Sequence, residues 1–278
     1  MEHSHTAKIL PPLALLSAIA LTALRVFHLR NFFDSDGMLP AQSSVLLITV
    51  LACAGFFLVL TLFCLRLNRL PGTEACFPQW GVWAFPKFVA AALLLAGTVL
   101  LLQNQTRMEA VWKYRITLVG ALSAPAMVWT ICSPRRGKSI FPARLLPALF
   151  TVAALIFRFR TWSHDPLVIH ITPALLAWVC CAMETMLLSG FPLGAGHRRS
   201  SVLFGLSAGI FTCMTMADYL LGQKTDIGEA LTLLGLAVWC TSAALELLQF
   251  RVQNELPASA EMQQAEGDTA PTTEPLPN

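Results

Sequence analysis

Apolar runs of roughly membrane-spanning length recur along the chain, and shorter polar segments separate them. A helix that crosses the hydrocarbon core needs about 20 mostly apolar residues at 1.5 Å each. No run alternates apolar and polar residues as a barrel strand does, and backbone groups in lipid must be paired within their own segment or in a closed barrel. We therefore expect an all-α, polytopic transmembrane helix bundle of about eight spans over residues 1–250. The predicted spans are Ile9–Leu29, Ser44–Leu65, Phe85–Leu102, Ile116–Cys132, Ile140–Phe157, Pro166–Leu188, Ser200–Leu221 and Ala230–Phe250.

Two of these spans leave alternatives open. The fifth is the weakest, because Arg144 interrupts it and only Leu145–Phe157 is free of charge, so seven spans is the alternative count. The first resembles a signal peptide, with small residues at 18–20 where cleavage would fall. Because its apolar run continues past that point and begins with Pro11 and Pro12, an uncleaved helix fits better.

Composition supports a membrane protein. The chain is 55% hydrophobic and 13% charged, whereas soluble domains average about 45–50% apolar and about 25% charged. Its formal net charge is only +3, spread over the connections, and it forms no basic stripe that would follow a phosphate backbone. We therefore expect the lipid bilayer as partner and no nucleic acid.

The distribution of Lys and Arg predicts the orientation, because cytoplasmic loops carry the excess of these residues. With a cytoplasmic N-terminus, eleven fall on the inner side and eight on the outer side. The prediction is a multi-pass protein of the cell membrane with both termini in the cytoplasm. The densest basic cluster, Arg135, Arg136 and Lys138, is either a topology signal alone or a contact for anionic lipid.

The C-terminal segment differs from the rest of the chain. Residues 251–278 are rich in Gln, Glu, Pro, Thr and Ala, and Arg251 is their only basic residue. Such a segment cannot bury enough apolar surface to offset the entropy lost on ordering. We predict a disordered acidic tail.

Small residues at four-residue spacing occur in two spans, Gly120 and Ala124 in the fourth and Gly205 and Gly209 in the seventh. In lipid such residues let helix backbones approach closely. We expect both spans inside the bundle, with homodimerisation through the Gly205 pattern, and hence a homo-oligomer, as the alternative.

A weak internal similarity bears on the architecture. Arg25 is followed after fifteen residues by Pro40, and Arg158 is followed after fifteen by Pro173. Both segments leave the membrane on the same predicted side. Two parallel four-helix halves would explain this similarity, and chance explains it equally well.

Ionisable residues within spans are costly and are usually functional. Three acidic residues qualify, Glu184, Asp218 and Glu246, each about 10 Å from the bilayer centre at 1.5 Å per residue. The two glutamates fall toward the inner side and Asp218 toward the outer side. They handle an ion or a proton, or they belong to structural ion pairs.

The structural interpretation names the partners. Arg198 or Arg199 would pair with an inner glutamate, and Arg25 or Lys224 would pair with Asp218. Arg25 therefore joins the three acidic residues as a candidate for substrate or ion handling.

Motifs for catalysis or cofactor binding are missing from the chain, which has no P-loop, no Gly-x-Ser-x-Gly and no His-Glu-x-x-His. His164, Asp165 and His170 have no evident fourth ligand and a spacing that does not put both histidines on one helix face. We expect no metal and no cofactor. The best interpretation is a small-solute permease; the alternatives are a non-catalytic sensor, scaffold or assembly factor, and a membrane enzyme acting on a lipid.

Overall fold

The computed structural model describes residues 3–31, 44–67, 76–77, 81–103, 111–133, 137–162, 168–221 and 226–249, and within these ranges all regular structure is helical. Eight of the helices are long and apolar enough to cross a membrane, which confirms a membrane helical bundle and the predicted eight spans. They are α1 (His3–Asn31), α2 (Ser44–Leu65), α3 (Ala84–Gln103), α4 (Val111–Cys132), α5 (Phe141–Trp162), α6 (Val168–Gly190), α7 (Arg198–Leu220) and α8 (Ile227–Gln249). Short 3₁₀ turns, η3 (Gly137–Ile140) and η4 (Phe191–Leu193), precede α5 and follow α6.

Arg144 does not interrupt the fifth span. It lies in the first turn of α5, which continues to Trp162, five residues beyond the predicted end. Its Nη1 donates a hydrogen bond to the carbonyl oxygen of Leu188 near the end of α6, at 3.2 Å. The charge therefore sits at one end of the span, and the seven-span alternative is wrong.

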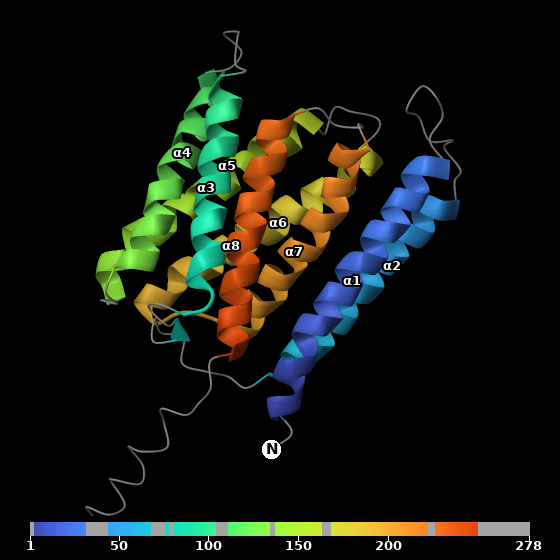
Figure 1. The fold of residues 1–278 in the computed structure, drawn as a ribbon, viewed down its shortest axis with the longest axis horizontal. Helices are drawn as coiled ribbons and strands as arrows, with labels where there is room; N and C mark the ends of the chain where they lie inside the picture. Colours follow the sequence, from blue (N-terminus) through green and yellow to red (C-terminus); the bar gives the residue numbers. More distant parts are fainter. Residues whose placement is uncertain are drawn as a thin grey trace, which may run out of the picture.

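Five helices form a closed ring (Figure 1). α3 packs against α4 and α8, α5 packs against α4 and α6, and α6 also contacts α8. α7 lies outside this ring against α6 and α8, and the α1–α2 hairpin packs on α7. The bundle is thus a five-helix ring with α7 and a hairpin added on one side, so α1–α4 and α5–α8 do not form two separate halves.

The closest crossing in the ring joins α3 and α8. A Cβ atom on Gly97 would lie 2.5 Å from the backbone nitrogen of Thr232, and one on Gly235 would lie 2.7 Å from that of Leu94. No side chain fits at either point. Small residues let the two backbones meet and gain dispersion contacts that apolar burial does not provide in lipid.

The small residues predicted in the seventh span face α8. A Cβ on Gly205 would lie 2.7 Å from the carbonyl oxygen of Cys240, and one on Gly209 would lie 2.6 Å from Oγ1 of Thr241. The prediction that α7 lies inside the bundle is confirmed. Because the Gly205 pattern is occupied by α8 of the same chain, the predicted homodimer contact through it is wrong.

The fourth span is less buried than we predicted. Ala124 is buried, and a Cβ on Gly120 would meet the ring of Phe150 at 2.6 Å, so one face of α4 packs closely. The other face exposes Leu122 and Trp129. Only 39% of the membrane-length part of α4 is buried, against 67% for α7, because α4 lies at the edge of the bundle.

The beginning of α1 and the end of α8 lie at the same face of the bundle (Figure 1). We call this the terminal face and the other the opposite face. The predicted acidic tail, residues 251–278, lies outside the described residues, as do Arg135 and Arg136, and only the backbone of Lys138 is described. The tail and the anionic-lipid contact therefore stay predictions.

Candidate functional site

A polar pocket opens at the terminal face among the five ring helices, and we call it the terminal vestibule. It encloses about 740 Å³ between its lining atoms, the open mouth included, of which about 50 Å³ accepts the centres of water-sized molecules. That is room for a few waters in the state described. The lining includes Lys87, Thr130, Arg144, Thr185, Trp239 and Glu246.

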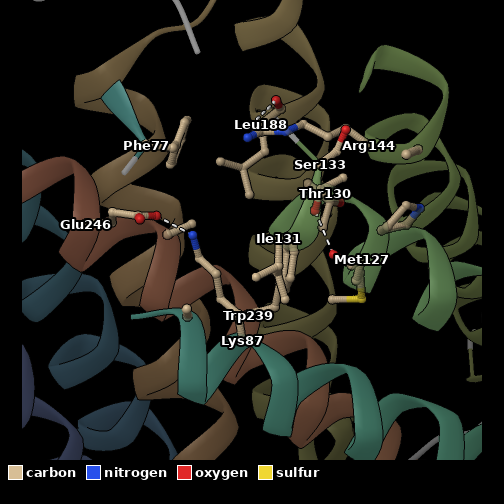
Figure 2. A pocket seen from close by; sticks show the side chains of 15 residues that line it. Phe77, Lys87, Met127, Thr130, Ile131, Ser133, Arg144, Leu188, Trp239 and Glu246 are labelled. Carbon is tan, nitrogen blue, oxygen red and sulfur yellow. Dashed lines mark hydrogen bonds and ion pairs between the residues drawn. The ribbon is translucent and has the colours of Figure 1, made fainter. Parts of the chain in front are cut away.

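Lys87 and Glu246 form an ion pair across the α3–α8 crossing (Figure 2). The glutamate side chain is 2% exposed and the lysine side chain 12% exposed. Lys87 Nζ also lies 5.4 Å from the ring centre of Phe77 and 5.9 Å from that of Trp239, within the range of cation–π attraction. Both charges lie about one turn from the ends of their helices, so the bundle holds an ion pair at the membrane boundary.

Arg144 lies on the other side of the vestibule (Figure 2). Its guanidinium carbon is 4.6 Å from the ring centre of Phe77, so both vestibule cations contact the same aromatic ring. The lining residues thus supply two cations and one carboxylate. This excess of positive charge, at the mouth of a low-dielectric protein, attracts anions.

A second polar pocket, the opposite vestibule, lies at the other end of the same ring. Arg158 Nε donates to Glu229 Oε1 at 2.8 Å, and the guanidinium carbon of Arg158 lies 3.9 Å from the ring centre of Trp178. The space open to the centres of water-sized molecules is about 140 Å³. The other polar lining residues are Lys113, Thr117, Thr161 and Asp226.

An aromatic pair separates the two vestibules. Phe150 and Trp178 meet edge to face with ring centres 6.3 Å apart, and both are buried. Pro147 lines the terminal vestibule and Phe150 the opposite one, although they are only three residues apart on α5, a rise of about 4.5 Å. The vestibules therefore approach within about one helical turn, and the aromatic pair closes the gap.

Trp178 also carries an unusual polar group. Its side chain is fully buried, and the indole Nε1 makes no hydrogen bond to any residue in the described part of the chain. A buried donor without an acceptor costs about 1–3 kcal/mol. The separating pair thus presents a donor that a polar molecule on this path would satisfy.

The sequence-predicted residues fall in three separate places. Glu246 lies in the terminal vestibule, whereas Arg25 and Asp218 form a buried ion pair at 2.8 Å between α1 and α7, toward the opposite face. The predicted pairing of Asp218 with Arg25 is confirmed. Glu184 lines neither vestibule, because its side chain faces α7, behind the ring. A role for these residues in ion or substrate handling stays a prediction.

Glu184 is fully buried, and its Oε1 accepts a hydrogen bond from Ser201 at 2.6 Å. The predicted pairing of the inner glutamates with the two arginines of α7 is wrong. Arg198 Nε donates instead to the carbonyl oxygen of Leu247, and Arg199 Nε to that of Leu67. The last carbonyls of a helix have no partner within it and favour cations, which explains why these arginines turn to the ends of α8 and α2.

This geometry separates two substitutions at the Glu184 contact. Ser201→Ala removes the donor and leaves the buried carboxylate without a hydrogen bond from the described residues, so we expect a loss of about 1–3 kcal/mol in the free energy of unfolding. Glu184→Gln keeps an acceptor oxygen and is expected to change that free energy by less than about 1 kcal/mol. Unfolding of the purified variants in mixed micelles measures both values. Equal losses would show that the hydrogen bond is not what stabilises this position.

Sequence reasoning missed three vestibule cations as site residues. It counted Lys87 and Arg158 as orientation markers and regarded Arg144 as a defect in a span. The available signal was that each charge lies a turn or more inside an apolar run. No group of three His, Cys, Asp or Glu side chains in the described ranges is placed to hold a metal, and His164 and Asp165 lie outside those ranges.

The fold and the two vestibules define a multispan helical membrane protein with ion-paired pockets at both ends of one helix ring. In comparisons with protein-family models, with curated proteins and with solved structures, the chain matches none of them. The functional argument therefore depends on the site itself.

Proposed function

We propose that this protein is a permease for small anionic solutes and that the structure is its closed state. The observation that carries the proposal is the pair of polar vestibules at opposite ends of one helix ring, separated by about one turn at Phe150 and Trp178. A path along the ring axis would need only this aromatic pair to move.

The charges of the two vestibules support an anionic solute. Lys87 and Arg144 outnumber Glu246 in the terminal vestibule, whereas acidic and basic residues balance in the opposite one. An anion entering at the terminal face meets two cations beside the Phe77 ring and, further in, the hydroxyl of Thr185. The Trp178 indole then lies ahead as a further donor.

One observation favours a sensor or scaffold instead, namely that the ring is filled between its vestibules by Phe150, Trp178 and the equally buried Met127. That alternative predicts a bundle that never opens. The lipid-enzyme alternative would need carboxylates and histidines gathered at one interface, and neither vestibule is lined by a histidine among the described residues.

We further propose that the terminal face is cytoplasmic and that the protein resides in the cell membrane, because the predicted inner side carries the larger share of Lys and Arg. The variant Gln263→Cys, made without the native cysteines, tests the orientation. Labelling of intact cells by an impermeant thiol reagent would overturn it.

Uptake into proteoliposomes tests the permease proposal. The probes are chloride, nitrate, formate and acetate, and we expect uptake of at least one above the level of empty vesicles. Arg144→Gln removes a charged donor worth about 1.5–3 kcal/mol and should lower that uptake by about tenfold or more. Lys8→Gln changes an exposed cation on α1, away from the ring, and should leave uptake unchanged. Background uptake of all four probes by the wild-type protein would contradict the proposal.

A further inference from the structure

A third cavity, unrelated to the vestibules, lies between the α1–α2 hairpin and helices α6 and α7. We call it the lateral groove. Its space for the centres of water-sized molecules is about 410 Å³, larger than that of either vestibule and within the size range of small-molecule sites. Apolar side chains form most of its wall, among them Phe57, Leu176, Val179, Phe204, Phe211 and Met214.

The polar lining of the groove is confined to one end. Arg25 and His28 lie near the end of α1, whereas Thr49 and Thr172 lie near the beginnings of α2 and α6. Because α1 runs away from the terminal face and α2 and α6 run back toward it, all four residues lie toward the opposite face. The groove is therefore amphipathic along its length.

The length of the groove matches half of a bilayer. On α2 the lining runs from Thr49 to Phe57, and on α6 it runs from Thr172 to Cys180. Each interval of eight residues rises about 12 Å. One leaflet contributes about 15 Å to a hydrocarbon core of about 30 Å, so the groove extends from one polar boundary almost to the midplane.

We propose that the lateral groove binds one acyl chain of a phospholipid from the leaflet at the opposite face. The chain lies against the phenylalanines and Met214, and the ester and phosphate oxygens lie at the end formed by Arg25, His28 and the two threonines. A phospholipid has the same order of polar and apolar parts as the wall. The sulfur atoms of Met214, Cys53 and Cys180 make the apolar wall soft and adaptable to a flexible chain.

The site is built by elements that the ring does not need. The Arg25–Asp218 ion pair, at 2.8 Å, ties α1 to α7 beside the polar end of the groove. A bound chain would fill the space that this tie leaves between the hairpin and the bundle. The proposal does not depend on the permease function.

Photocrosslinking tests the site in the intact protein, reconstituted in vesicles that contain phosphatidylglycerol with a diazirine in one acyl chain. We expect saturable labelling of lining segments 50–57 and 172–180, mapped by peptide mass spectrometry and reduced by excess unmodified lipid. Ala54→Trp places an indole in the groove and should lower this labelling by about tenfold or more. Ile48→Trp, on a part of α2 that is 52% exposed and does not line the groove, is the matched control and should retain it.

Val50→Trp provides a second groove-filling variant if Ala54→Trp fails to fold. Unsaturable labelling spread evenly over all lipid-facing helices would overturn the proposal, as would unchanged labelling in a folded groove-filling variant. Absence of lipid labelling together with crosslinking of the groove to a second copy of the chain would also overturn it, because the occupant would then be protein.

Discussion

Replacing Asp218 with leucine is expected to lower the free energy of unfolding by about 3–5 kcal/mol, the cost of leaving a buried charge without its partner. Asp218 and Arg25 have side chains that are 2% and 3% exposed, so water cannot take the place of either partner. The loss should appear as a lower midpoint when the purified protein is unfolded by denaturing detergent. Circular dichroism reports the remaining helix.

The double variant Arg25→Met and Asp218→Leu removes both charges and should regain most of the lost stability, since an apolar pair of similar volume often replaces a buried ion pair at little cost. Glu229→Gln is the matched comparison. It breaks the Arg158–Glu229 pair, whose side chains are 14% and 19% exposed, and should cost about 1 kcal/mol or less. A double variant as unstable as Asp218→Leu alone would show that the two charges are not coupled.

Phe150→Ala is expected to raise anion flux through proteoliposomes at least tenfold, which corresponds to lowering the barrier by about 1.4 kcal/mol. Phe150 lines the opposite vestibule and packs on Trp178, so its removal opens the one turn of α5 that separates the two pockets. The assay is uptake of the anion that the wild-type protein transports.

Leu149→Ala is the control for this gate, because Leu149 is the neighbouring residue on α5 and is 52% exposed toward lipid. It should leave flux at the wild-type level. Truncating a buried phenylalanine costs about 3–5 kcal/mol of stability, so the helix content of each reconstituted variant is measured alongside flux. A folded Phe150→Ala protein with wild-type flux would contradict the gate.

The spans could be predicted from the sequence because length and apolarity alone decide whether a helix crosses a bilayer. The predicted bounds of Ser44–Leu65 match α2 to the residue, and α5 extends beyond its prediction because Arg158 and Arg160 are accommodated near its end. Which helices are neighbours could not be predicted. Helices that face both lipid and protein are apolar on all sides, so the pattern does not mark the buried face.

Small residues show that a close approach is possible but not which helix approaches. Gly205 and Gly120 look alike in sequence, yet one faces the buried helix α8 and the other lies on a helix at the edge of the bundle. Ion pairs were predictable only where few partners existed. Arg25 was one of two cations in reach of Asp218, whereas the arginines of α7 had carbonyl acceptors that no sequence pattern reveals.

Accessibility of position 151 tests the central claim, a path along the ring axis, most directly. Thr151 is fully buried beside Phe150, and its hydroxyl lies 2.8 Å from that of Thr185 in the wall of the terminal vestibule. In a Thr151→Cys variant without native cysteines, a small anionic methanethiosulfonate that cannot cross lipid should react from both sides of the membrane, as the path opens to each in turn. Thr130→Cys, in the terminal vestibule, should react from the terminal face alone and shows that the protein is folded and oriented. Failure of the Thr151→Cys thiol to react from either side, while the Thr130→Cys thiol reacts normally, would contradict the permease.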